Sequence, residues 1–267
     1  MNSGRLMLAL AFPIFSASAE TNLERGKHVV DEALQALGGD NYLQMQDRIE
    51  TGRAYSFYRE ELNGLSLAKI YTRYLTRPEP PVPAYLGVRE REAFGKKQET
   101  AIIFGDNDGY DISFRGARPL PDNTLERFKE SMLRNVLYII RMRLGEPGLI
   151  FESRGADVVE NQSVDIVDIT DADNRVVTVY FSKVEHLPLK QVTYRRDLQI
   201  KDRIQEVTRF TKFRDVGGGV MWPFDIQRER DGEKIYQMFS DSVVINQGLT
   251  DNLFTLPANM KILKKPK

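Results

Sequence analysis

Side chains that could do catalytic chemistry are scarce in this sequence. Cysteine is absent, and histidine occurs only as His28, in an expected helix, and His186, in an expected turn. A Cys–His dyad is therefore impossible, and a Ser–His–Asp triad would need one of these two histidines, while no serine lies in a nucleophile-elbow motif. We expect both histidines to have surface or capping roles and the protein not to be an enzyme.

Acidic residues, which are the usual ligands of calcium, gather at two places in the sequence. The first cluster consists of Asp165, Asp168, Asp171 and Asp173. It resembles a calcium loop, but glycine is missing from the sixth position and glutamate from the twelfth. We interpret it as an Asx-rich turn between strands, and 106–108 as a second such turn. The sequence predicts no metal site and no cofactor.

The first residues have the features of a secretory signal peptide. Arg5 is followed by a short apolar stretch, 6–15, and by the small residues Ala17-Ser18-Ala19. The apolar stretch is too short to span a bilayer, so we expect residues 1–19 to be removed and the mature chain to begin at Glu20 in the periplasm. Without a cysteine after the cleavage site, the protein is not expected to be a lipoprotein itself.

Charge is balanced over the whole chain, with 38 basic and 38 acidic residues. Nucleic-acid binding would need a basic excess on one face, so we expect no nucleic-acid partner. Only the tail, 261–267, is locally basic. We interpret it as a frayed, solvated end, with contact to an anionic membrane as the alternative.

An apolar segment in the middle of the chain, 123–144, is expected to form one long helix. Its apolar residues recur at the three- and four-residue spacing of two neighbouring helical stripes. Asn123 and Glu126 resemble a capping box at its start, and Gly145 with Pro147 would end it. The β-branched Val136, Ile139 and Ile140 leave open that the second half is a strand.

The rest of the chain has the signals of antiparallel strands. Before the apolar segment, strands are expected over 49–57, 65–76, 87–94, 98–104 and 110–114, with a hairpin at Asn63-Gly64 and a proline-rich interruption at 77–83. After it, they are expected over 149–153, 164–170, 176–183, 187–196, 204–214, 220–230 and 234–245. Turns are expected between them, at Gly155 and 199–202 among others.

Short hairpins between nearly all strands exclude a parallel sheet with crossover helices. We therefore predict a mainly β (α+β) fold, with one large antiparallel sheet curled around the mid-chain helix. A further helix is expected to begin at a capping box, Thr21 to Glu24, and to end at Gly38-Gly39. Because no change in composition marks a boundary, residues 20–260 are expected to form a single domain.

Several stretches of the chain carry a resemblance to a known family. Tyr74-Leu75-Thr76-Arg77-Pro78 leads into the proline-rich segment, Leu187-Pro188-Leu189 opens a strand, Gly219 to Pro223 forms a "G-v-x-x-P" strand, and Leu253 to Pro257 ends the pattern. This order resembles periplasmic lipoprotein carriers of the LolA/LolB-like superfamily, in the outer-membrane lipoprotein-sorting branch. Many members have Gly-Trp before the central helix, whereas this chain has Gly109-Tyr110.

The resemblance implies a half-open antiparallel barrel whose hollow is covered by the N-terminal and mid-chain helices. It also implies that acyl chains are carried between membranes without a cofactor, and that a basic strand residue latches the carrier. Arg73 and Arg77 are the two candidates for that latch.

Aromatic and other apolar residues could line such a hollow, although each could equally be core. We expect the lining to include Tyr55, Phe57, Tyr71, Tyr110, Phe128, Met132, Val136, Ile140, Trp222, Phe224 and Met238. The expected function is a periplasmic carrier or chaperone for lipid or lipoprotein acyl chains, with displacement of the mid-chain helix as the gate. The alternative is a non-catalytic interaction or sensor domain that binds a protein partner of the cell envelope, such as a membrane protein.

Overall fold

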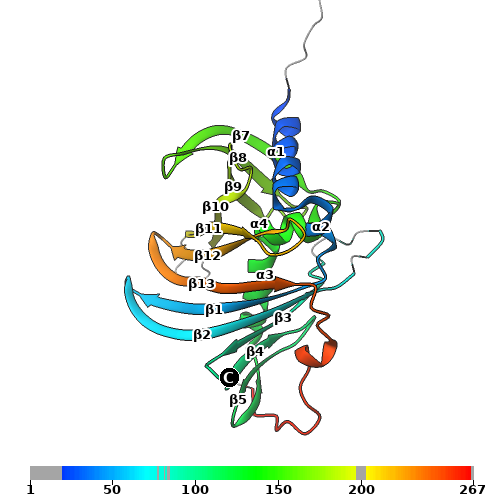
Figure 1. Cartoon of the computed structure of the whole chain (residues 1–267), viewed down its shortest axis with the longest axis vertical. Coiled ribbons are helices and arrows are strands. Elements are labelled where there is room, and N and C mark those ends of the chain that lie inside the picture. Colours follow the sequence, from blue (N-terminus) through cyan, green and yellow to red (C-terminus); the bar gives the residue numbers. More distant parts are fainter. Residues whose placement is uncertain (1–19, 77, 81, 83–84, 197–202, 266–267) are drawn as a thin grey trace, which may run out of the picture.

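The computed structural model describes residues 20–76, 78–80, 82, 85–196 and 203–265 (Figure 1). Four features expected from the sequence lie outside these residues. They are the signal peptide 1–19, the latch candidate Arg77, the turn at 199–202, and the last two residues of the basic tail.

Thirteen strands form one antiparallel sheet, as the turn pattern predicts. The first six are β1 (Asp47–Tyr58), β2 (Glu61–Tyr74), β3 (Val88–Phe94), β4 (Thr100–Phe104), β5 (Gly109–Ser113) and β6 (Gly116–Pro119). The other seven are β7 (Ile150–Val159), β8 (Gln162–Thr170), β9 (Val176–Ser182), β10 (Pro188–Arg196), β11 (Arg203–Asp215), β12 (Met221–Arg230) and β13 (Glu233–Ile245). Of these, only β6 has no counterpart among the expected strands.

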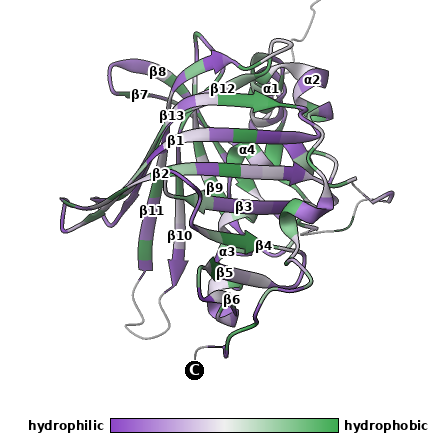
Figure 2. Cartoon of the chain, turned by 60° about the horizontal axis from the view of Figure 1, so that its bottom comes forward, coloured by the Kyte–Doolittle hydropathy of each residue, from purple (hydrophilic) through white to green (hydrophobic). Residues whose placement is uncertain are grey.

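The order of the strands makes the sheet an open, curled structure. It runs β6-β5-β4-β3-β2-β1-β13-β12-β11-β10-β9-β8-β7, so the first strand pairs with the last and the middle of the chain supplies both edges. Strands β10 and β11 run across the direction of β1 to β4 (Figure 2), which shows how far the sheet curls. The half-open architecture is confirmed, because β6 and β7 remain unpaired with each other.

Two turns lie at positions other than those expected. The first hairpin turns at Arg59-Glu60, both with positive φ, and not at Asn63-Gly64. Ser56 pairs with Gly64 and Phe57 with Leu62, so Asn63 forms a bulge within β2. Gly155 follows a second bulge, at Arg154, inside a β7 that is longer than expected, and the turn comes at Glu160-Asn161. At Gly155, with φ of 90°, the bulge uses the conformational freedom that the sequence pattern assigns to a turn.

The N-terminal helix α1 (Asn22–Leu37) begins and ends where the sequence predicts. Thr21 Oγ1 accepts a hydrogen bond from the Glu24 backbone N–H at 3.2 Å, and Glu24 Oε2 accepts one from the Thr21 N–H at 2.8 Å. Gly38 ends the helix with φ of 122°, and the short helix α2 (Gly39–Gln44) follows. Helix α1 lies against β7 and β8 at one end of the sheet (Figure 1).

The mid-chain segment is helical, but it is not one long helix. It consists of α3 (Asp122–Leu133), the single turn α4 (Val136–Tyr138) and the π-helix η1 (Ile139–Arg143). The break occurs because the Asn135 side chain accepts hydrogen bonds from the Leu137 N–H at 2.9 Å and the Tyr138 N–H at 3.4 Å, which caps a new helix. Pro121, and not an Asn123–Glu126 box, precedes α3, and the strand alternative for the second half is wrong.

Burial differs sharply between the two parts of this segment. All residues of α4 and η1 are buried, and several belong to the main core between α1, α4, η1 and strands β8 to β13. In α3, by contrast, only Leu133 is buried. Phe128 of α3 stacks on Phe104 of β4, with ring centroids 3.9 Å apart, so α3 lies over the inner, concave face of the sheet.

A second core lies on the other face of β2 to β6, beneath the segment that follows β13. Phe254, in the 3-10 helix η2 (Asp251–Phe254), packs there with Tyr71 and Ile103. Farther along, the Ala117 N–H donates to the Lys261 carbonyl at 2.9 Å, and the Leu263 N–H donates to the Ala117 carbonyl at 2.8 Å. The tail is therefore not frayed where it is described, since it pairs with β6 as far as these residues.

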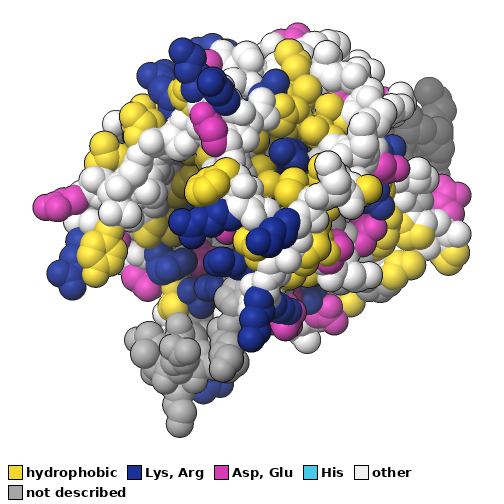
Figure 3. All heavy atoms as spheres, turned by 90° about the horizontal axis from the view of Figure 1, so that it is seen from below, with side chains coloured by type: hydrophobic (Ala, Val, Ile, Leu, Met, Phe, Trp, Pro, Cys, Tyr) yellow, Lys and Arg dark blue, Asp and Glu magenta, His cyan; other side chains and the backbone are white. Residues whose placement is uncertain are grey.

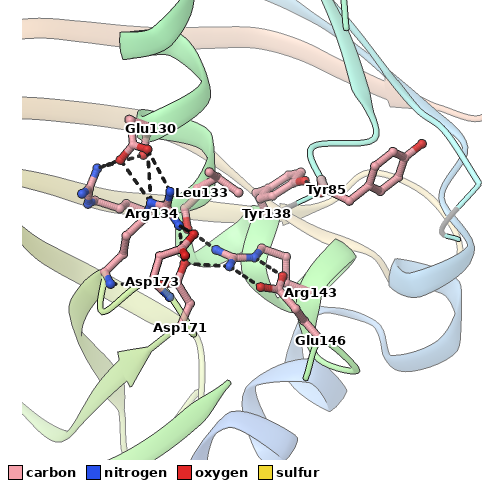
Figure 4. A network of polar contacts seen from close by, with 10 residues as sticks. Tyr85, Glu130, Leu133, Arg134, Tyr138, Arg143, Glu146, Asp171 and Asp173 are labelled. Carbon is pink, nitrogen blue, oxygen red and sulfur yellow. Dashed lines mark hydrogen bonds and ion pairs between the residues drawn. The ribbon is translucent and has the colours of Figure 1, made fainter. Parts of the chain in front are cut away.

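A buried ion network fastens η1 to the β8–β9 turn (Figure 4). The Arg143 guanidinium binds Glu146 through two bonds of 2.6 and 2.7 Å, Asp171 at 2.8 Å, and the Leu133 carbonyl at 2.6 Å. Arg143 is 2% exposed, so water cannot replace these partners. Arg175 extends the network from Asp171 to Glu130 of α3.

Replacing Arg143 by methionine should strongly destabilise the protein. The substitution removes the Arg143 cation from the buried Glu146 and Asp171 carboxylates and leaves Asp171 with Arg175 alone. Losing this cation costs about 3–5 kcal/mol in the free energy of unfolding. Urea unfolding followed by circular dichroism measures this loss. Arg154→Met is the matched control, because Arg154 forms an exposed ion pair with Asp168 and its loss should cost less than about 1 kcal/mol. Equal effects of both variants would contradict the assignment.

Candidate binding groove

Two adjoining cavities lie between the mid-chain helices and the concave face of the sheet. The first, of about 200 Å³, is lined by residues of β1, β2, β3, β12 and β13 together with Met132, Leu137 and Tyr138. The second, of about 230 Å³, lies between α3 and strands β10 to β13. Asn135 and Arg228 line both. We call the two cavities together the groove, the first its acidic half and the second its basic half.

Charged side chains occupy the floor of the acidic half. Arg48 donates to Thr72 Oγ1 at 2.9 Å, and Thr72 donates to Glu90 Oε2 at the same distance. The Arg48 Nε lies 3.8 Å from a Glu50 carboxylate oxygen, and Ser240 donates a short hydrogen bond to Glu50. These side chains are buried, so the hollow is not the purely apolar space that the sequence suggests.

A pair of neighbouring carboxyls, Glu90 and Glu92, lies on the same face of β3. Burial raises the pKa of Glu90, against the opposing effects of Arg48 and Thr72. Burial also raises the pKa of Glu92 to about 7, and the repulsion and hydrogen bond of Glu90 add to the effect. Near neutral pH the pair therefore gains and loses a proton, as two close carboxyls in a low-dielectric site do.

Aromatic and aliphatic side chains form the walls of the acidic half. The Arg48 guanidinium lies 3.8 Å above the Trp222 ring. The buried Trp222 Nε1–H has no hydrogen-bond acceptor among the described residues. The remaining apolar walls are Ile70, Phe94, Met132, Leu137, Ile226 and Met238. A buried donor without an acceptor is uncommon in folded proteins, and here it belongs to a cavity wall.

Arginines dominate the basic half, which is lined by Arg127, Arg134, Arg195, Arg228 and Arg230 with Glu130, Glu206 and Glu229. Arg134 pairs with Glu130, and Arg195 pairs with Glu206 at 2.9 Å. Within the described part of the chain, no ion pair within 4 Å is found for Arg127 or Arg228. Lys and Arg side chains gather in the middle of the face seen in Figure 3, with hydrophobic side chains among them.

Some of the apolar residues expected at the hollow do lie there. Met132, Trp222 and Met238 line the acidic half. Phe128 lies beside it, stacked on Phe104. Val136, Ile140 and Phe224 are instead packed in the main core behind the groove.

Four aromatic residues and the latch candidate Arg73 lie outside the groove. Tyr71 and Tyr110 pack in the second core, under the C-terminal segment. Tyr55 packs edge-on against Phe239, and Phe57 lies under the Lys234 ammonium. Because side chains alternate along a strand, these residues point away from their groove-facing neighbours Ala54, Ile70 and Met238. Arg73 pairs with Asp251 of η2 on this outer face, so it does not reach the groove.

Sequence reasoning missed the charged residues of the groove, namely Arg48, Glu50, Glu90, Glu92 and Arg228. A signal for them exists, because Arg48 and Glu50, like Glu90 and Glu92, are two residues apart and so share a strand face with apolar neighbours. Charged residues normally mark the solvent face of a strand, however. The alternation by itself therefore predicts that these residues are exposed to solvent and not inside the groove.

The residues first considered for catalysis and metal binding have structural roles. His28 is exposed and His186 half-buried, and both lie 3.3 Å from Glu32. Asp171 accepts from the Asp173 N–H at 3.1 Å and the Arg175 N–H at 2.9 Å, as expected of an Asx turn. No cluster of three acidic or histidine side chains suited to a metal ion occurs among the described residues. In the same part of the chain, no helix has the length and hydropathy to span a membrane.

The raised pKa of Glu92 makes stability depend on pH. The folded protein holds the proton up to about pH 7, whereas an unfolded glutamate releases it near pH 4.5. The resulting stabilisation is present below pH 4.5 and is lost as pH rises through 7. We expect the free energy of unfolding to fall by about 1–3 kcal/mol between pH 5 and 8.

Glu92→Gln should remove most of this fall, because glutamine keeps the shape and cannot ionise. Urea unfolding at a series of pH values measures it. The exposed Glu61 at the start of β2 is the control position, and Glu61→Gln should leave the slope unchanged. A Glu92→Gln variant with the slope of the unsubstituted protein would contradict the prediction.

Comparison with solved structures shows which fold this is. No protein-family model matches the sequence, and no curated protein does. A domain designated as an outer membrane lipoprotein-sorting protein, from Vibrio parahaemolyticus, superposes with a TM-score of 0.58 at 14% identity, over 87% of this chain and 97% of that one.

Two other structures match at similar levels. A DUF1329 family protein from Desulfovibrio piger gives a TM-score of 0.59 at 13% identity, over 88% of this chain and 98% of that one. A LolA superfamily protein from Nitrosomonas europaea gives 0.52 at 10% identity, over 86% and 97%. The resemblance seen in the sequence is thus confirmed at the level of the fold, which this chain shares with LolA-like and lipoprotein-sorting domains.

Proposed function

We propose that this protein is a non-enzymatic periplasmic carrier that shelters the acyl chain of a lipid or lipoprotein in the groove. The observation that carries the proposal is a cavity with apolar walls and a buried, unpaired indole N–H, covered by a helix that is itself weakly buried. The shared fold supports it, since one of the matching structures is designated as lipoprotein-sorting.

The small size of each cavity supports a groove that opens to admit its ligand. Pockets for drug-sized ligands typically measure about 300–1,000 Å³, and each half of the groove is smaller than that. An acyl chain that gains about 0.8 kcal/mol per buried methylene group could displace α3, which buries only Leu133. Asn135 is the natural hinge, because α4 and η1 beyond it are fixed in the core.

Filling the groove should abolish binding of acyl chains. Ile226 lies on its wall, and Ile226→Trp places a larger ring in the space that the chain would take. We expect delipidated protein to bind a fluorescent fatty acid at micromolar concentrations, and this variant to bind it at least tenfold more weakly. Val158→Trp, at an exposed position on β7, is the control and should bind normally. Unsubstituted protein that binds neither fatty acid nor lipopeptide would refute the proposal.

Fixing α3 to the sheet should also prevent binding. The chain has no cysteine, so Phe104→Cys with Phe128→Cys introduces the only two thiols, where the native rings stack. Bridging them with a short bismaleimide ties α3 to β4. We expect the bridged protein to lose fatty-acid binding and the unbridged double variant to keep it. Binding that survives the bridge would show that α3 is not the gate.

A second candidate function is binding of a protein partner in the cell envelope. Large apolar side chains are exposed near the β1–β2 hairpin, where Tyr58, Leu62 and Leu65 are each more than half exposed. Exposed apolar patches often mark interaction sites. Recovery of a single stable protein partner, together with the absence of any lipid in extracts of the purified protein, would favour this function over the carrier.

A further inference from the structure

The two halves of the groove meet at one side chain, Arg228 of β12. It lines both cavities, opposite Asn135 at the hinge between α3 and α4. On one side it faces the carboxyls Glu90 and Glu92, whose charge it stabilises. On the other side, Arg228 lines the basic half. Arg228 therefore has two possible anionic partners, namely the Glu90–Glu92 pair and an anion bound in the basic half.

Neither partner holds Arg228 tightly in the structure. Its guanidinium lies over the Tyr236 ring at 5.5 Å, and among the described residues no carboxylate lies within ion-pair distance of it. Two other arginines at this end of the groove, Arg134 and Arg195, are engaged by Glu130 and Glu206. Arg127 has no described ion pair either, but it donates to the Asn123 carbonyl at 3.0 Å and lines only the basic half. Arg228 is therefore the groove cation best placed to accept an additional anion.

We propose that Arg228 binds the anionic head group, a phosphate or a carboxylate, of the amphiphile that enters the groove, in competition with Glu90 and Glu92. This inference rests on the proposed carrier function and adds to it the chemical class of the ligand. The chain of the amphiphile lies along the apolar walls at Met132, Ile226 and Met238, and the head group lies in the basic half.

The surroundings of the carboxyl pair determine how this competition depends on protons. The titratable and charged groups that line the cavity with the pair are Arg48 and Glu50 of β1, Tyr74 of β2, Arg228 of β12, Tyr236 of β13 and Tyr138 of α4. Arg48 is already engaged by Glu50 and, through Thr72, by Glu90. Arg228 is thus the cation that the Glu92 carboxylate attracts when Glu92 loses its proton.

The sign of the pH effect follows from the pKa of Glu92, which burial raises to about 7. Below that pH the pair holds its proton, and Arg228 is available to an anion. As pH rises through 7, the second carboxylate attracts Arg228 and repels the head group. Binding of an anion should therefore favour proton uptake, and by linkage the affinity should fall with rising pH.

The experiment compares three probes on delipidated, full-length mature protein. Lysophosphatidylglycerol and a monoacylglycerol of the same chain differ in charge, and glycerol phosphate lacks the chain. Isothermal titration calorimetry at pH 6 should show lysophosphatidylglycerol binding at least tenfold more tightly than monoacylglycerol, with glycerol phosphate binding far more weakly than either. Glycerol phosphate that binds as tightly as the lipid would overturn the inference, because the site would then accept the free anion.

Variants at Arg228 test whether this residue is the head-group site. Arg228→Gln should weaken lysophosphatidylglycerol binding 10- to 100-fold and change monoacylglycerol binding less than twofold, because a charge-assisted pair is lost and the walls remain. Arg228→Lys should restore most of the preference. Arg154→Gln, which removes an exposed arginine of β7, is the control. An unchanged preference in Arg228→Gln would overturn the assignment.

Repeating the titrations at several pH values distinguishes failure of this inference from failure of the carrier function. Between pH 6 and 8 the affinity for lysophosphatidylglycerol should fall several-fold, and Glu92→Gln should abolish this fall. If both lipids bind equally and independently of pH, the inference fails and the carrier function stands. If neither lipid binds, the carrier function fails as well.

Discussion

Pairing of the first strand with the last is the constraint on which the whole structure depends. Strand β1 joins β13 over nine residue pairs from Arg48 to Ser56, with one bulge, and this joins the two ends of the chain at the middle of the sheet. The buried Asp47, at the start of β1, holds the segment that follows β13. Its carboxylate accepts hydrogen bonds from the backbone N–H groups of Gln247, Gly248 and Leu249 at 2.7 to 3.0 Å. Both free edges then come from the middle of the chain, which leaves the mid-chain helices at the opening of the curl.

The break at Asn135 divides the mid-chain segment into a part that is fixed in the core and a part that is only weakly buried. Beyond it, α4 and η1 are buried and fixed by the ion network of Arg143. Before it, α3 is attached by the Phe128–Phe104 stack, by the ion pair of Glu130 with Arg175 and by the packing of Leu133 against Val88. Local stability follows buried contacts, so a helix with one buried residue next to a fully buried one is the part most easily displaced.

The groove combines apolar walls with a charged floor, and this combination restricts what can occupy it. A purely apolar hollow would select ligands by size alone, whereas buried polar groups reject ligands that leave them unpaired. Arg48 donates to Thr72 and lies 3.8 Å from Glu50, but among the described residues neither the Arg48 Nε nor the Trp222 N–H has a hydrogen-bond acceptor. Arg228 has no ion pair in the same part of the chain. The groove thus favours a ligand with a long apolar part and an anionic end.

The sequence by itself determined the class of fold, because that information is local. The capping box at Thr21 and Glu24, the alternation along the strands and the short turns were enough to predict an antiparallel sheet with an N-terminal helix. Local signals also misled where a bulge and a turn look alike, as at Asn63 and Gly155, and where periodicity could not reveal that Asn135 caps a new helix.

Only the tertiary structure decided which strand face looks into the groove. Alternation shows that Tyr71 and Ile70 point to opposite faces, but not which one is covered by α3 and which by the C-terminal segment. Both faces of β2 and β3 are covered, so hydrophobicity does not separate them. The aromatic residues were therefore assigned to the hollow while Glu90 and Glu92 were overlooked. Neither the C-terminal segment that covers one face nor α3, which covers the other, leaves a trace in the local sequence of β2 and β3.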